Sequence, residues 1–167
     1  MTASSPPLSG SESVVPSSSL RIVIVASFYN DEAVSGLIAG AQGELRRSAH
    51  ADASCRVVHV PGAWELPWAA LHLARSRQAD ALVALGAVIR GETDHYRHLA
   101  RAVSDGLMRV MLDTGIPLGF GLLTTDDEVQ AMARSGSGSN KGAEAMAAAL
   151  ALLDLSHTLD GGENSAS

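Results

Sequence analysis

The segment at residues 82–99, LVALGAVIRGETDHYRHL, contains side chains whose types and spacing could do chemistry. An apolar run passes through a short turn into an amphipathic helix, and the first backbone N–H groups of a helix have no partner within it. Arg90 supplies a fixed positive charge, and His95 supplies a side chain that exchanges a proton near neutral pH. Open α/β sheets bind their ligands at such strand-to-helix junctions. The segment therefore predicts a ligand site that can move a proton.

Three other unusual segments are expected at the same edge of a parallel sheet: SFYN at 27–30, VPGAWELP at 60–67 and GFGLLTT at 119–125. They place Tyr29 and Trp64 at this edge, although a protein core would normally bury such side chains. A planar polar ligand stacked on an aromatic ring is the simplest reason. The alternative interpretation is that both rings only cover the ends of helices.

The glycine-rich loop at 134–141, RSGSGSNK, leads into a helix and has a cation at each end, Arg134 and Lys141. A helix N-terminus with a guanidinium nearby binds anions, phosphate especially. Serine–glycine loops often serve only as connections, so the signal is weak by itself. Because the chain has no Walker A motif and no GxGxxG after a strand, nucleoside triphosphates and dinucleotides are not expected.

His95 and His98 are three residues apart and could face the same side of a helix, a spacing that also suits a metal ion. The other candidate ligands nearby are Asp94 and Glu92, without a cysteine or an HExxH motif, so no metal site is predicted. A helix N-terminus disfavours the charged imidazolium, which favours a neutral base. Glu65 begins a helix, where a carboxylate either complements the helix dipole or accepts hydrogen bonds from ligand hydroxyls.

Strand-like and helix-like segments alternate along the chain, which predicts a parallel sheet covered on both faces. Strands are expected at 20–26, 56–60, 79–89 and 117–124, and helices after the first strand, at 66–75, after Thr93 as N-cap, at 126–134 and at 141–155. We therefore predict a three-layer α/β/α sandwich with a central four-stranded parallel sheet, formed by residues 20–156. A mobile N-terminal tail is expected at 1–19 and a flexible end at 157–167, because both lack large apolar residues.

The composition excludes several classes of protein. The chain has 167 residues, a net charge of −6 and only 4% aromatic residues, so Ala, Val and Leu must form most of the core and no basic surface for nucleic acid is expected. A single cysteine, Cys55, excludes an internal disulfide, and its strand-like neighbours predict an inert thiol. Neither a signal peptide nor a membrane-spanning segment is recognisable, so we expect a cytoplasmic protein.

The four segments, together with NKGAEAMAAAL in the last predicted helix, resemble the lumazine synthase family of riboflavin biosynthesis. The resemblance covers about residues 20–155 and implies a flavodoxin-like fold. It implies that 5-amino-6-(D-ribitylamino)uracil condenses with 3,4-dihydroxy-2-butanone 4-phosphate to give 6,7-dimethyl-8-ribityllumazine, phosphate and water. Neither a metal nor an organic cofactor is implied.

The resemblance also implies a role for individual residues. His95 is the expected catalytic residue for proton transfer. The expected contacts of the ribitylaminouracil are Tyr29, Asn30, Ala63, Trp64, Glu65, Ala87, Val88, Ile89, Phe120 and Lys141. The expected phosphate contacts are Glu92, through its amide, Thr93 and Arg134. Phe120 is expected to close the pocket from an adjacent subunit.

Members of this family form pentamers with the site between neighbours, and in some species twelve pentamers form a 60-subunit shell. The short loop at 134–140 permits a shell without requiring one. The chain departs from the family pattern at Phe28, at Tyr29 and at Arg97–His98, which replaces the usual acidic and aromatic pair. Two alternatives remain: an archaeal-type riboflavin synthase on the same fold, and a relative that binds flavin or lumazine without converting it. The histidine of the VIRGETDH run favours the synthase.

Overall fold

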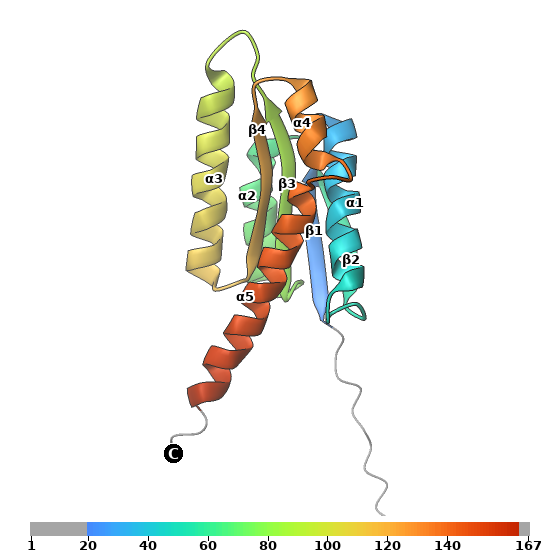
Figure 1. The fold of residues 1–167 in the computed structure, drawn as a ribbon. Coiled ribbons are helices and arrows are strands. Elements are labelled where there is room, and N and C mark those ends of the chain that lie inside the picture. The colour runs from blue at the N-terminus through green and yellow to red at the C-terminus, as the bar shows by residue number, and fades with distance from the viewer. Residues whose placement is uncertain (1–19, 164–167) are drawn as a thin grey trace, which may run out of the picture.

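A computed structural model describes residues 20–163, and the tail expected at 1–19 lies outside them. Four strands and five α-helices alternate, with one short 3-10 helix (Figure 1). In chain order they are β1 Arg21–Ser27, α1 Asp31–Arg47, β2 Ser54–Val60, η1 Ala63–Glu65, α2 Leu66–Arg75, β3 Ala81–Ile89, α3 His95–Thr114, β4 Leu118–Thr125, α4 Glu128–Ser135 and α5 Lys141–Glu163. The predicted α/β class is confirmed.

The sheet has the strand order β2-β1-β3-β4, and every pair of neighbours is parallel. β3 is buried along almost its whole length, as its unbroken apolar sequence ALVALGAVI predicts for an inner strand with both faces covered. Because all four strands run in the same direction, their carboxyl ends lie at one edge. The segments that follow β1, β2 and β3 therefore meet there.

Helices cover both faces of the sheet and enclose one apolar core on each side. Figure 1 shows α2 and α3 on one face and α1, α4 and α5 on the other. Leu66, Leu82 and Val103 belong to the first core, and Val34, Leu85 and Met146 to the second. As the composition indicates, aliphatic side chains form nearly all of both cores.

Most element boundaries lie within two residues of those expected, and two differences are informative, at the start of α3 and at the end of α5. α3 begins at His95 with Asp94 at the N-cap, and the hydroxyl of Thr93, the expected N-cap, accepts only a long 3.4 Å hydrogen bond from the His95 N–H. α5 continues to Glu163, through residues whose composition predicted a flexible end. No proline interrupts the helix there, and Figure 1 shows this last part extending beyond the sheet. Within residues 20–163, no helix is long and apolar enough to cross a membrane.

Gly119 tests the packing of α5 on the sheet. A Cβ at this position of β4 would collide with the backbone carbonyl of Ala145 in α5. Gly119→Ala should lower the free energy of unfolding by about 1–3 kcal/mol, because backbone must shift to make room. Gly138→Ala is the control, since nothing lies within 4 Å of a Cβ there. Urea unfolding at equal protein concentration measures both, and equal midpoints for the two variants would contradict this packing.

Candidate active site

A pocket of about 590 Å³ lies at the carboxyl edge of the sheet, where the sequence predicts a ligand site. It is formed by the turn after β1, the loop before α2, the end of β3 and the turn leading into α3. Its lining residues are Tyr29, Asn30, Gly62, Ala63, Trp64, Ala87, Val88, Ile89, Gly91, Thr93, His95, Tyr96 and Leu99. The structure therefore brings together nine of the residues expected at the site.

Tyr29 and Trp64 are the large aromatic side chains at the mouth of this pocket. Their exposed fractions are 73% and 63%, far above those of the core residues. Neither ring is buried over a helix end, so the interpretation that they only cover helices is not supported. Two exposed rings on different lining segments provide surfaces on which a planar ligand can stack.

Asn30 fastens the Tyr29 turn to β3. Its backbone is left-handed, with φ 60°, a conformation that asparagine tolerates better than most residues. Its Nδ2 donates a 2.7 Å hydrogen bond to the carbonyl oxygen of Ala87. Since Ala87 also lines the pocket, this bond sets the spacing between the first two walls of the site.

Glu65 shapes the loop that carries Trp64. Its Oε2 accepts a 2.9 Å hydrogen bond from the backbone N–H of Gly62, which closes the loop at the start of η1. The carboxylate is half-buried and does not line the pocket of the isolated chain. The structure shows this local bond, and the expected contact of Glu65 with ligand hydroxyls stays a prediction.

The turn into α3 brings His95 and Thr93 to the pocket. Tyr96 also lines it, although this residue is not among those expected at the site; its place directly after His95 is the signal that could have found it. Arg97 Nε donates a 2.9 Å hydrogen bond to the Tyr96 hydroxyl, and this bond raises the pKa of the Arg97 guanidinium. Glu92 is in the same turn, exposed and outside the lining.

Arg90 and Cys55 lie outside the pocket lining. Arg90 Nη1 lies 3.8 Å from Asp126 Oδ1, which links the turn after β3 to the segment after β4. Cys55 is half-buried in β2, and burial raises the pKa of its thiol, as expected for an unreactive cysteine. Within the described part of the chain, no three His, Cys, Asp or Glu side chains are grouped so that they could hold a metal ion.

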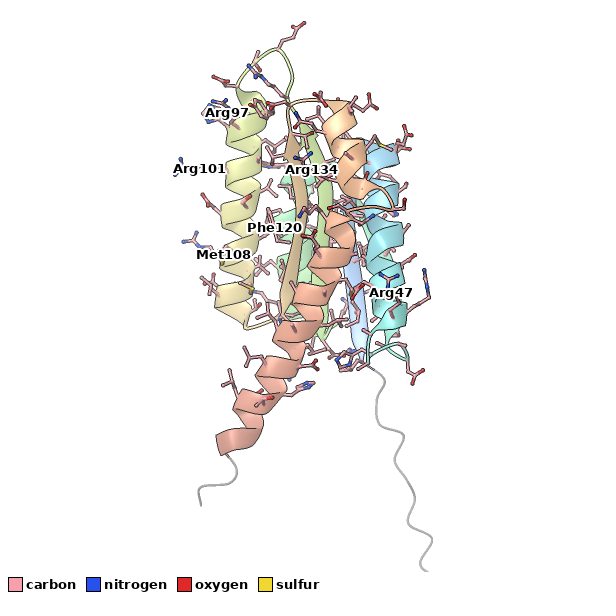
Figure 2. All side chains as sticks on the ribbon, in the orientation of Figure 1. Arg47, Arg97, Arg101, Met108, Phe120 and Arg134 are labelled. Carbon is pink, nitrogen blue, oxygen red and sulfur yellow. The ribbon has the colours of Figure 1, made fainter. Side chains whose placement is uncertain are left out.

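Phe120, Arg134 and Lys141 do not line this pocket in their own chain. Phe120 is half-exposed on β4, and Figure 2 places it and Arg134 along the β4 side of the sheet. Arg134 Nη1 donates to the Gln130 carbonyl at 3.0 Å, and Lys141 Nζ pairs with Glu144 at 2.7 Å. These three side chains are therefore separate from the nine that the pocket unites.

The glycine-rich loop does not present a free helix N-terminus. Asn140 Oδ1 accepts hydrogen bonds from the N–H groups of Gly142 and Ala143, at 2.9 and 3.1 Å. The side chain thus caps α5 and uses the donors that an anion would need. The predicted phosphate site at this helix start is not supported, although Arg134 itself stays exposed at the end of α4.

Fold and pocket together define an α/β protein with a site at the carboxyl edge of its sheet, lined by exposed aromatic rings and a histidine. A family profile described as 6,7-dimethyl-8-ribityllumazine synthase matches residues 19–157, so the chain belongs to this family.

Curated relatives of the same name agree with this match. The protein from Leifsonia xyli subsp. xyli is 48% identical over 145 residues, which cover 85% of this chain and 89% of the relative. The protein from Nitratidesulfovibrio vulgaris (strain DP4) is 48% identical over 132 residues, 78% of this chain and 85% of the relative. The protein from Kineococcus radiotolerans is 48% identical over 139 residues, 81% and 84% of the two chains.

Replacing Asn30 tests how the pocket is held open. Asn30→Ala should lower the free energy of unfolding by about 2 kcal/mol, because the Ala87 carbonyl loses its donor and alanine is strained at positive φ. Asn30→Gly loses the same bond but accepts the backbone angle, so its loss should be about 1 kcal/mol. Urea unfolding separates the two terms. Equal losses in the two variants would show that backbone strain at position 30 does not matter. No loss in either variant would show that the hydrogen bond to Ala87 does not stabilise the fold.

Proposed function

We propose that this chain condenses 5-amino-6-(D-ribitylamino)uracil with 3,4-dihydroxy-2-butanone 4-phosphate to give 6,7-dimethyl-8-ribityllumazine, as a transferase of riboflavin biosynthesis. The single observation that carries this conclusion is the family match across residues 19–157. The pocket agrees with it, because it combines stacking surfaces with a histidine. The relatives reported above all carry the name of the synthase, so neither alternative, an archaeal-type riboflavin synthase or a non-catalytic binding protein, is favoured.

The pocket can hold a pyrimidine by stacking and by backbone contacts. Tyr29 offers an exposed ring for the uracil, and Trp64 borders the space left for the ribityl chain. Val88 and Ile89 come at the end of β3, where peptide groups can meet the polar edge of the ring. A site built this way gains rate chiefly by holding two reactants in one orientation.

His95 then serves as the residue that transfers protons. The amine of the uracil attacks the ketone of the second substrate, and water leaves as the Schiff base forms. A proton then leaves the carbon next to the imine, phosphate leaves from the adjacent carbon, and the resulting enol takes up a proton at carbon to become a methyl ketone. The second nitrogen closes the ring on this ketone with loss of another water. Each step moves a proton to or from nitrogen, oxygen or carbon, and an exposed imidazole at the pocket can accept and return it.

The phosphate group needs a cation that the pocket of one chain does not provide. No lysine or arginine is among the residues lining it in the described structure. Arg134 and Phe120 lie instead along the β4 side, away from their own pocket. We propose that a neighbouring copy supplies Phe120, Arg134 and Lys141, while Thr93 and the Glu92 amide meet the phosphate from this chain.

Such an arrangement joins two different surfaces of the same chain, the pocket and the β4 side. Repeated head-to-tail contacts of this kind close into a ring. We propose a pentamer, which can build a 60-subunit shell, and a cytoplasmic location beside its small-molecule substrates. Sedimentation or light scattering measures the assembly, and a monomeric mass at working concentration would rule out the shared site.

His95→Ala should lower kcat by roughly 10²–10⁴-fold with little change in KM, because general acid–base help is lost while the binding surfaces remain. Formation of the lumazine is followed by absorbance with both substrates. His98→Ala is the matched control, since His98 is exposed on the same helix and does not line the pocket. Equal rates in His95→Ala and the parent would contradict the proposed catalytic role of His95. No product from a folded parent would leave a protein that holds a ligand without converting it.

Arg134→Ala should raise the KM for the butanone phosphate by about tenfold or more, since a charge-assisted hydrogen bond to phosphate is lost. The KM for the pyrimidine should stay near that of the parent. Arg47→Ala is the control, because Arg47 is an exposed arginine of α1 that pairs with Glu44 (Figure 2). An unchanged KM for the phosphate substrate in Arg134→Ala would contradict the assignment.

A further inference from the structure

Tyr96 forms a wall that the pocket shares with the apolar core. It lines the pocket beside His95 and Leu99, yet only 8% of the residue is exposed. Its ring belongs to the core between the sheet and the α2–α3 layer, together with Leu66 and Val88. A shift of this ring would therefore change the shape of the pocket next to the proton-transferring side chain.

Arg97 holds this wall from the solvent side. Its Nε donates a 2.9 Å hydrogen bond to the Tyr96 hydroxyl, and its guanidinium carbon lies 5.6 Å from the centre of the ring. The guanidinium is planar and stays charged, so it can only donate and the hydroxyl must accept. The contact therefore fixes both the position of the hydroxyl and the rotation of the side chain.

Besides its backbone bonds and the packing of Tyr96, the first turn of α3 has few side-chain hydrogen bonds to hold it. Asp94 at the N-cap makes no side-chain hydrogen bond to the helix, and the Thr93 hydroxyl reaches the His95 N–H only at 3.4 Å. Weakly capped helix ends fray first. The Arg97–Tyr96 pair is thus the short side-chain hydrogen bond within the turn that carries His95.

We propose that Arg97 is a positioning residue of the pocket: through the Tyr96 hydroxyl it holds the Tyr96 ring in place against the bound pyrimidine. This inference rests on the proposed function and adds a residue to it. It gives a role to Arg97, which stands where the family resemblance leads one to expect an acidic side chain. Arginine donates to the hydroxyl, whereas a carboxylate could only accept from it.

A double-mutant cycle tests this role. Tyr96→Phe keeps the ring and removes the hydroxyl, and Arg97→Ala removes the donor. Each should weaken binding of 6,7-dimethyl-8-ribityllumazine about fivefold, the size expected for the loss of one ordinary hydrogen bond, and raise the KM for the pyrimidine alike. The double variant should bind like either single variant, because both remove the same bond.

Two further variants distinguish the bond from the charge. Arg97→Lys keeps the positive charge without the rigid donor and should bind as weakly as Arg97→Ala. Arg101→Ala, one turn further along α3 and exposed (Figure 2), should bind like the parent. Calorimetric titration gives the affinities. Thermal unfolding of the variants should show little change in Tm, whereas a purely structural role of Arg97 would lower the Tm.

Four results would overturn the inference in a parent that binds the lumazine: no change in either single variant, additive losses in the double variant, full binding by Arg97→Lys, or an equal loss in Arg101→Ala. Additive losses would mean that Arg97 meets the ligand directly. A parent that neither binds the lumazine nor forms it would instead refute the proposed function, so the two failures are separate.

Discussion

The burial of β3 between β1 and β4 is the constraint on which the rest of the structure depends. Pairing on both edges and apolar cores on both faces leave this strand a single register. Its last residues, Ala87 to Ile89, therefore stand at a fixed place, and they form the floor of the pocket. The Asn30 amide is attached to this part of β3 by its hydrogen bond to the Ala87 carbonyl. Every other lining segment is positioned relative to it.

Short turns at the carboxyl edge of the sheet carry the side chains that could act on a ligand. The Gly62–Glu65 bond folds the loop that exposes Trp64, and the left-handed Asn30 turn exposes Tyr29. The third turn leads into α3 and carries His95, but it is held more loosely than the other two. Exposed rings on hydrogen-bonded turns, beside a histidine on a weakly capped helix start, agree with the proposed reaction, in which orientation supplies much of the rate and several protons must move in sequence.

Much of this could be predicted from the sequence, for physical reasons. An unbroken apolar run such as ALVALGAVI can only be an inner parallel strand or a buried helix, and alternation with amphipathic segments decides for the strand. Parallel strands then force the pocket residues to one edge, so Tyr29, Trp64 and His95 follow. The end of α5 could not be predicted, because polar residues tolerate helix and loop alike. Tyr96 was missed because its apolar ring and helical position are those of a core residue. The capping of α5 by Asn140 depends on side-chain geometry that spacing alone does not specify.

Mixing two impaired variants tests most directly whether a neighbouring copy completes each pocket, provided that the butanone phosphate is kept well below the parental KM. His95→Ala retains Arg134, and Arg134→Ala retains His95, so neither alone forms a complete site at any interface. If the site is shared head to tail, random mixed oligomers of equal parts should regain about a quarter of the parental activity, because one interface in four combines both intact side chains. Mixed oligomers that assemble but are no more active than the average of the two separate variants would contradict the shared site and place both residues in one chain's pocket.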